Sequence, residues 1–300
     1  MTDIRFTKSS YLENTSFQKI KNLEEVCSKH DQIFFKFELD YKLRDAIEKQ
    51  KKGEALPNND FFCYQGDNLI GYAGIDSFGD GMPEVSGVIL PEFRRKRLFS
   101  KLIDSVETEL RSRGHKKYLL LTDANSFSGK GFIQTRNGIP YQVEIEMELP
   151  FDTAIDAIDD SVELVLATNL DAQEISRQNR MFLKPEEESN LVLLPEEEVK
   201  RGMEIYLAKY NKNTIGKIHL QFQGDSAWIF GFILAPAFRG KHLGRAVLHK
   251  SIQLMRNRQI KHILLQVDSK NLVAHALYRQ TGFRELYAME YYEMKINKVD

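Results

Sequence analysis

The sequence repeats itself over a long distance, and this repeat constrains the fold more than any other feature. The pattern Pro-x-Phe-Arg-x-Lys-x-Leu occupies residues 91–98 and returns 145 residues later at residues 236–243. The same offset relates the segment 119–123 to the segment 264–268, where residues 119, 120 and 123 are identical to residues 264, 265 and 268. Two separated matches in one register indicate a duplication, and so long a period indicates two domains rather than a solenoid.

The repeat predicts two domains of ordinary size, residues 1–150 and residues 161–300. The segment from Pro150 to Ser161 is acidic and weakly periodic. We interpret it as a linker, with an acidic helix of the first domain as the alternative.

Both halves predict the same order of elements: helices, a hairpin, a strand that leads into a basic turn, a helix, a strand, a short helix and a last strand. In the first half, helices are expected within 14–50 (the second from Phe35 on) and at 98–113, and strands at 61–64, 69–75, 84–90, 118–121 and 143–149. In the second half, strands are expected at 162–167, 204–210, 215–222, 227–234, 262–267 and 286–296, and helices at 171–183, 243–258 and 272–281; residues 185–200 form a helix or a loop.

Composition excludes several classes of protein. The chain has 42 basic and 43 acidic residues, so no overall positive field favours nucleic acid. The longest apolar stretch, residues 228–238, is too short to span a bilayer, and the polar first ten residues do not form a signal peptide. Two cysteines are typical of a reducing compartment. We therefore expect a cytoplasmic protein without a nucleic-acid or membrane partner and without a bound metal.

The second copy of the repeat contains the strongest functional signal. An apolar strand reaches Pro236, a basic turn with Gly240 and Gly244 follows, and apolar residues then recur at helical spacing. A helix N-terminus presents unpaired amides and the positive end of the helix dipole, and glycine lets a ligand approach the backbone. A phosphate or pyrophosphate is the natural ligand, and a solvated surface turn is the alternative.

The turn resembles the acyl-CoA pyrophosphate loop of the GNAT family of N-acetyltransferases, whose pattern is Arg/Gln-x-x-Gly-x-Gly/Ala. Here residues 239–244 read Arg-Gly-Lys-His-Leu-Gly, so His242 replaces the first glycine of the pattern. Residues 271–283 match a second family motif, Asn-x-x-Ala-x-x-Leu-Tyr-x-x-x-Gly-Phe. The order of elements matches the family in each half. The resemblance implies two tandem GNAT-like α/β (α+β) domains, each with a mixed, mostly antiparallel sheet flanked by helices.

The resemblance also implies roles for individual residues. Tyr278 protonates the departing CoA thiolate, and Asn271 contacts the pantetheine arm. The strand offers main-chain hydrogen bonds to pantetheine and the thioester, and the turn holds the pyrophosphate. The implied acyl-CoA-binding residues, besides Asn271, are Ile233, Leu234, Ala235, Arg239, Gly240, Lys241, His242, Leu243, Gly244 and Arg245.

The general base and the first half depart from the family pattern. Trp228 stands where many members have the glutamate that acts as general base. The remaining candidates are His219, Asp225, a water relay or an amine that arrives already neutral. The alternative for His219 is an ordinary half-exposed strand residue without a catalytic role. In the first half, Arg97 and Phe99 replace glycines, and counting back from a glycine gives Gln134 or Phe127 at the tyrosine position. We expect this half to have lost acetyl transfer and to shape the acceptor site or stabilise the pair.

The leading hypothesis is an acetyltransferase that uses acetyl-CoA as co-substrate. It would acetylate a primary amine of a small molecule or peptide, with its active site in the C-terminal half. A non-catalytic acyl-CoA-binding or regulatory module is the alternative, and Trp228 favours it. An aminoacyl transferase that uses charged tRNA ranks third, because such enzymes generally lack the pyrophosphate loop. The sequence does not name the acceptor or the oligomeric state.

Overall fold

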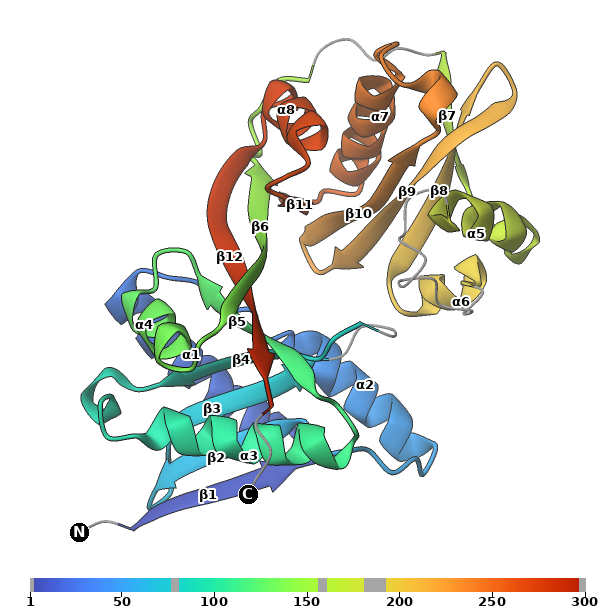
Figure 1. Cartoon of the computed structure of the whole chain (residues 1–300). Coiled ribbons are helices and arrows are strands. Elements are labelled where there is room, and N and C mark those ends of the chain that lie inside the picture. The colour runs from blue at the N-terminus through green and yellow to red at the C-terminus, as the bar shows by residue number, and fades with distance from the viewer. Residues whose placement is uncertain (1–2, 77–80, 156–160, 181–192, 297–300) are drawn as a thin grey trace. The chain divides into compact units, whose positions relative to one another are not determined.

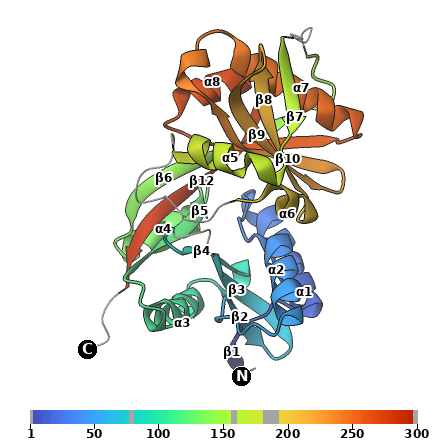
Figure 2. The ribbon, with the colours of Figure 1, turned by 90° about the vertical axis from the view of Figure 1, so that its right-hand side faces the viewer.

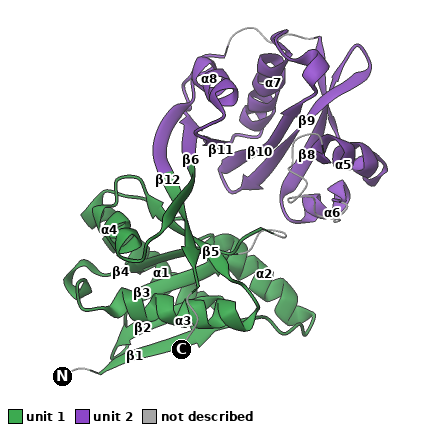
Figure 3. Cartoon of the chain, viewed as in Figure 1, with its two compact units in different colours: residues 1–143, 289–300 green, residues 144–288 purple. Residues whose placement is uncertain are grey.

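A computed structural model describes residues 3–76, 81–155, 161–180 and 193–296 of the chain. The chain forms two compact units (Figure 3): unit 1 comprises residues 1–143 and 289–300, and unit 2 comprises residues 144–288. Three expected segments lie partly outside the described residues: the linker at 156–160, the helix 171–183 at 181–183 and the glutamate-rich segment at 185–192.

Unit 1 is a six-stranded sheet in the order β1-β2-β3-β4-β5-β12, with helices on both faces (Figure 1). Its pairs are antiparallel except β4 with β5, which are parallel. The strands are β1 Ile4–Ser9, β2 Asp60–Gln65, β3 Asn68–Asp76, β4 Glu84–Ile89, β5 Lys117–Asp123 and the part of β12 (Arg284–Lys295) from Met289 on. The helices are α1 Asn14–Asp31, α2 Leu39–Lys51, α3 Leu98–Ser112 and α4 Phe127–Thr135.

The two faces of the unit 1 sheet are both apolar, because its strands alternate their side chains between two cores. Phe61 and Cys63 of β2 pack with α3, whereas Phe62, between them, packs with α1 and α2. Figure 2 shows α1 and α2 on one side of these strands and α3 on the other. The period of two along a strand therefore determines this three-layer arrangement.

Unit 2 repeats the arrangement with the strand order β7-β8-β9-β10-β11-β6. Here too a single pair, β10 with β11, is parallel among the described pairs. The strands are β7 Val162–Leu166, β8 Met203–Tyr210, β9 Asn213–Gln223, β10 Ser226–Leu234, β11 His262–Asp268 and the part of β6 (Ile139–Leu149) from Glu144 on. The helices are α5 Ala172–Arg180, α6 Pro195–Lys200, α7 Leu243–Asn257 and α8 Leu272–Thr281.

The last strand of each repeat belongs to the sheet of the other repeat. The strand β6 follows the first repeat in sequence, yet residues 144–149 pair with β11 of unit 2. The strand β12 follows the second repeat, yet residues 289–295 pair with β5 of unit 1. The register is the same in both, because Leu149 lies opposite Ile263 and Met294 lies opposite Tyr118. Met294 is 145 residues after Leu149, and Ile263 is 145 residues after Tyr118.

Several element boundaries differ from the expected ones. The polar N-terminus was not expected to be a strand, but Ile4–Ser9 pairs with β2 at the edge of the sheet. One face of an edge strand can remain exposed to solvent, so polar side chains are tolerated there. Helix α2 begins at Leu39 rather than Phe35, because Glu38 has left-handed backbone at its N-cap. Strand β6 begins at Ile139, before the expected Val143. The other expected strands, both halves' helix after the basic turn and both short helices are present within a few residues.

The close approach of β9 to β10 gives a testable prediction. A Cβ at Gly216 would overlap the carbonyl oxygen of Ile233 and come within 3.1 Å of the Cα of Leu234, and backbone cannot move aside cheaply. We expect Gly216→Ala to lower the free energy of unfolding by about 1–3 kcal/mol in urea denaturation. Gly131→Ala is the control: no atom lies within 4 Å of its added Cβ, and α4 should gain roughly 0.5–1 kcal/mol. Equal effects of the two changes would contradict the prediction.

Candidate active site

The basic turn of unit 2 has the backbone that an anion site needs. Gly240 and His242 are left-handed, with φ of 71° and 60°, and α7 begins at Leu243 directly afterwards. Within the described part of the chain, the amides of residues 240–244 form no hydrogen bond. Arg239 donates its Nε–H to the carbonyl of Leu234 at 2.9 Å, which ties the turn to the end of β10. Five neighbouring amides therefore stay available to a ligand.

The side chains around this turn leave the amides accessible. Gly240, Lys241 and His242 are exposed. A Cβ at Gly244 would lie 3.7–3.8 Å from atoms of Leu277, Leu234 and Phe232, so there is room for a Cβ beside the first turn of α7 but these side chains already contact it. The His242 substitution does not change the backbone, since His242 adopts the left-handed conformation that the glycine of the pattern would supply.

The strand β10 contains a bulge before the turn. Its register with β9 shifts between Phe230 and Ile233, and Gly231 in the bulge has φ of 50°. β10 pairs with β11 only over residues 226–229. Residues 233 and 234 pair with β9, and the Ala235 amide donates to Ile215. Beyond the bulge, the edge of β10 toward β11 therefore has no described ladder and can bind an extended ligand.

Tyr278 and Asn271 lie on α8. Asn271 is the N-cap residue, and its Oδ1 accepts the Ala274 amide at 3.2 Å. The Tyr278 side chain is 7% exposed, and its ring packs edge-on against Phe283 at 5.9 Å. No described residue forms a hydrogen bond with its hydroxyl group, and burial raises the pKa of Tyr278 to about 12. The phenol is thus protonated at neutral pH and can donate a proton.

The candidates for a general base lie in different surroundings. Asp225 is exposed and forms an ion pair with Lys261 at 3.5 Å. Trp228 is partly buried on β10. His219 is not the half-exposed residue that the sequence suggested: it is 7% exposed, because its neighbours on β8 and the helix α5 cover this face.

Sequence reasoning missed Lys217, which lies two residues before His219 on the same face of β9. Its side chain is 1% exposed, and its Nζ lies 2.6 Å from Nε2 of His219. Burial lowers the pKa of Lys217 to about 8, and burial together with the Lys217 charge lowers the pKa of His219 to about 3. The two-residue spacing on a strand was visible in the sequence, but the burial was not.

The first repeat has the same turn backbone with different side chains. Arg95 and Arg97, 145 residues before Gly240 and His242, have φ of 61° and 60°. Arg94 donates to the Ile89 carbonyl, as Arg239 does to Leu234, and also forms a bidentate ion pair with Asp31 at 2.9 and 2.6 Å. The turn geometry therefore does not require glycine at either position.

An aromatic ring fills the same space in both units but comes from opposite elements. In unit 1, the ring of Phe99 on α3 lies where a Cβ at Gly87 of β4 would come within 2.7 Å of it. In unit 2, Phe232 occupies the repeat position of Gly87, and Gly244 that of Phe99. The Phe232 ring lies 3.8 Å from the Cβ that Gly244 lacks. The large and the small residue have exchanged places.

Unit 1 contains a cavity of about 360 Å³ next to its turn. The lining includes Arg94, Arg97, Phe99, Ser126 and Ile133. The residue at the repeat position of Tyr278 is Ile133, and not the Gln134 or Phe127 expected from the sequence. The residue that corresponds to Gly282 is Asn137, which also has left-handed backbone, so counting back from a glycine gave the wrong position. The described pairing of β4 with β3 has no bulge. This cavity thus lacks the phenol and the bulge of unit 2.

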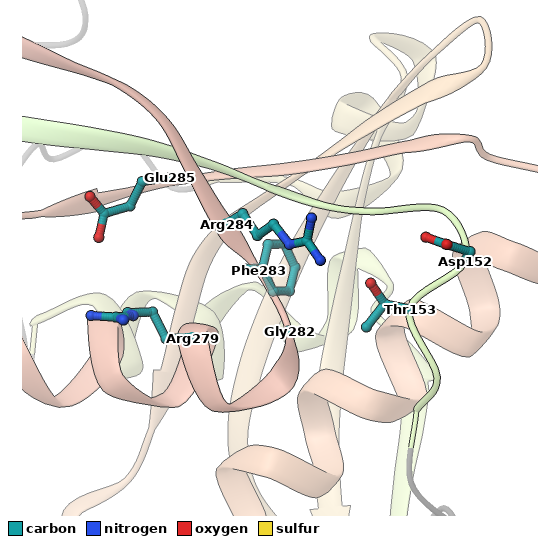
Figure 4. A pocket seen from close by; sticks show the side chains of 7 residues that line it. All are labelled: Asp152, Thr153, Arg279, Gly282, Phe283, Arg284 and Glu285. Carbon is teal, nitrogen blue, oxygen red and sulfur yellow. The ribbon is translucent and has the colours of Figure 1, made fainter.

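Unit 2 contains two further cavities near the end of α8. One, of about 700 Å³, is lined by Asp152, Thr153, Arg279, Gly282, Phe283, Arg284 and Glu285 (Figure 4). In this view the Arg284 guanidinium lies between the Phe283 ring and the Asp152 and Thr153 side chains. The other, of about 550 Å³, lies beside Glu148 and His262. Neither is lined by Tyr278 or by the turn.

Two further searches of the described residues bear on ligands and location. None of the described helices is both long and apolar enough to cross a membrane. In the described part of the chain, no three His, Cys, Asp or Glu side chains are grouped so that they could hold a metal ion.

Comparison with known proteins agrees with the repeat. The model of the family described as "Acetyltransferase (GNAT) family" matches residues 23–134 and residues 171–283. No curated protein matches the chain. Among solved structures, a GCN5-related N-acetyltransferase from Sphaerobacter thermophilus is 17% identical, with a TM-score of 0.79 over 98% of this chain and 97% of that one.

Two further structures show the same tandem fold at low identity. A tandem GNAT protein from the clavulanic acid biosynthesis pathway, solved without AcCoA, is 12% identical, with a TM-score of 0.72 over 99% of this chain and 100% of that one. A GNAT-family acetyltransferase from Colwellia psychrerythraea is 13% identical, with a TM-score of 0.61 over 97% of this chain and 100% of that one. The expected mixed α/β sheets flanked by helices are thereby confirmed.

The buried Lys217 predicts how stability depends on pH. Its pKa is about 8 in the fold against 10.5 for a free side chain, so between these values the unfolded chain binds the extra proton and stability rises with pH. The rise should be roughly 3 kcal/mol from this group alone. In Lys217→Met, the free energy of unfolding measured in urea at pH 8 and above pH 10 should not show this rise. Lys209→Met, on the neighbouring strand, should keep it; loss of the rise in both variants would contradict the assignment.

Proposed function

The chain belongs to the acetyltransferase (GNAT) family, and on this premise we propose that it moves an acetyl group from acetyl-CoA to a primary amine of a small molecule or peptide. The active site lies in the C-terminal half, in the domain that the sequence assigns to residues 161–300. The observation that carries the proposal is the run of unpaired amides at residues 240–244.

The turn of unit 2 suits the pyrophosphate of acetyl-CoA. Amides of residues 240–244 would bind the phosphate oxygens, and Arg239, Lys241 and Arg245 would supply positive charge. The free edge of β10 from Ile233 to Ala235 would bind the pantetheine arm through main-chain hydrogen bonds. Asn271, which caps α8 through Oδ1, keeps its amide nitrogen for the same arm.

The chemistry needs one nucleophile and one proton donor. The amine nitrogen attacks the thioester carbonyl, the C–N bond forms and the C–S bond breaks. The leaving thiolate takes a proton from the Tyr278 hydroxyl, and the nitrogen gives up one proton, so one proton is exchanged and the thiol is released. The protonated phenol, with its hydroxyl unbound in the described structure and its pKa raised to about 12, supports this role.

The N-terminal half differs at the positions that carry this chemistry. Ile133 replaces the phenol, and the described part of β4 pairs without a bulge. We assign no transfer to this half. Its cavity beside Arg94 and Arg97 remains a place for a ligand, which supports the second candidate, a non-catalytic acyl-CoA-binding or regulatory module. Trp228 in place of the usual carboxylate also favours that candidate.

Removing the phenol separates the two candidates. We expect Tyr278→Phe to lower kcat about 100-fold or more in a thiol-release assay with acetyl-CoA and a panel of amines, because thiolate protonation is lost. The affinity for acetyl-CoA in titration calorimetry should change little. Tyr210→Phe on β8 is the matched control and should keep the wild-type rate. A binding module would instead show acetyl-CoA affinity in all three proteins and no thiol release in any.

Blocking each half in the full-length chain tests which one works. We expect Gly244→Trp to abolish transfer, because side chains already lie 3.7–3.8 Å from an added Cβ and the indole must project over the turn or displace it. Gly131→Trp places an indole at a residue of α4 that lines the unit 1 cavity and where no atom lies within 4 Å of an added Cβ. This variant should transfer acetyl groups at the wild-type rate. Loss of transfer in Gly131→Trp with retention in Gly244→Trp would place the activity in the other half.

A further inference from the structure

Two polar side chains are buried on the face of β9 that α5 covers. Leu207 and Ile205 of β8 lie directly opposite Lys217 and His219, and these two β8 residues form a small apolar core with α5. Ile218, between the polar pair, points to the other face and joins the core of α7. Lys217 and His219 therefore share one face of the sheet, beneath α5.

The Lys217 amine has no carboxylate partner among the described residues. Its contacts are Nε2 of His219 at 2.6 Å and the carbonyl oxygen of Gly231 at 3.5 Å. Its cross-strand neighbours on β8 and β10, Leu207 and Ile233, are apolar. An ammonium buried without an opposite charge is costly, so the neutral amine is favoured.

The charged residues of α5 are Glu174, Arg177 and Arg180, and the first two pair with each other. Arg177 and Glu174 form a hydrogen-bonded pair with each other at 2.7 Å, on a partly exposed surface. His219 is then the one titratable group that directly contacts Lys217 among the described residues.

The equivalent position in unit 1 shows what a structural lysine looks like in this fold. Tyr72 occupies the repeat position of Lys217, and its hydroxyl lies 3.2 Å from the Nζ of Lys42. That lysine also contacts Asp60 at 3.4 Å and Asp76 at 3.5 Å, so its charge is compensated. Lys217 lacks such carboxylates, and a purely structural role does not explain why an uncompensated amine is kept there.

The pair lies against the bulge of β10. A Cβ at Gly231 would come within 3.1 Å of the His219 ring, and the Gly231 carbonyl is the second partner of Lys217. Gly231 and Phe230 are exposed, so the buried amine lies one residue from solvent at this bulge. Ile233, which the proposed function assigns to the acyl-CoA arm, lies opposite Lys217 on the neighbouring strand.

The helix α5, which covers this face, also carries a buried polar atom without a partner in the described structure. Oε1 of Gln178 on α5 is buried without a hydrogen bond in the described structure, and the side chain is 2% exposed. An unsatisfied buried acceptor destabilises the fold, and a donor from a ligand would relieve this. An amine or ammonium group offers such a donor.

We propose that Lys217 is the proton acceptor for the attacking amine, with His219 holding its Nζ beside the bulge, and this rests on the proposed acetyl transfer. The acceptor R–NH₃⁺ gives one proton to the neutral Lys217 amine. The resulting R–NH₂ attacks the thioester, the thiolate takes a proton from Tyr278, and the second proton that leaves the nitrogen restores the Tyr278 phenol. Lys217 then releases its proton to solvent. Lys217 thus does the work of the glutamate that many family members have at the position of Trp228.

The test is a pH–rate profile on the full-length protein, between about pH 6 and pH 10. Two alkylamine acceptors from the panel are used whose own pKa values differ by about two units. In the wild type, kcat/KM should rise with a midpoint near pH 8 with both acceptors and level off above it, because the limb belongs to the lysine. Lys217→Met should lower kcat about 100-fold or more and lose this limb. Its KM for acetyl-CoA should stay within about threefold, and Lys209→Met should match the wild type.

Each other outcome decides the matter differently. If the wild type releases no thiol with any amine, both the proposed function and this inference fall. If the wild type works and Lys217→Met keeps its rate and limb, only this inference falls. A Lys217→Met variant that loses acetyl-CoA affinity or melts earlier than the wild type would show a structural role, and a limb that moves with the acceptor pKa would assign it to the acceptor.

Discussion

The structure depends on a short stretch of left-handed backbone between a strand and the helix that follows it. In both repeats the residue before the helix has φ of 60°, although it is Arg97 in one and His242 in the other. Non-glycine residues in this region cost of order 1–3 kcal/mol each and persist only where the surroundings impose them. The strand end, fastened by Arg94 or Arg239, and the buried start of the helix impose it here. The amides are left unpaired as a consequence.

This constraint explains how the two repeats could diverge without losing the turn. The exchange of Gly87 and Phe99 for Phe232 and Gly244 keeps one ring in the space between strand and helix. It changes the side from which the ring enters, and so changes which element stays open to a ligand. In unit 1 the helix start carries the ring, and in unit 2 it carries no side chain.

The sequence predicted what depends on local pattern, and missed what depends on distant partners. The turn, the helices after it and the duplication follow from spacing within a few residues. The pairing of residues 289–295 with β5 could not be predicted, because an exchanged strand satisfies the same pattern as an unexchanged one. The bulge at Gly231 and the burial of Lys217 were missed for a similar reason, since register shifts and covering helices are set by tertiary packing. Only Trp228 signalled that the glutamate of many family members is absent at this position.

The contrast between the two buried lysines shows what the duplication makes possible. Both amines are buried between the sheet and the first helices of their unit, where a charge is expensive, but Lys42 belongs to helix α2 and Lys217 to strand β9. Lys42 is compensated by Asp60 and Asp76, and its cluster closes that face of unit 1. Lys217 has a neutral histidine as its partner and an exposed bulge beside it. One copy surrounds its buried amine with carboxylates, while the other keeps a buried amine whose pKa is about 8. A single domain would have to do both with one set of positions.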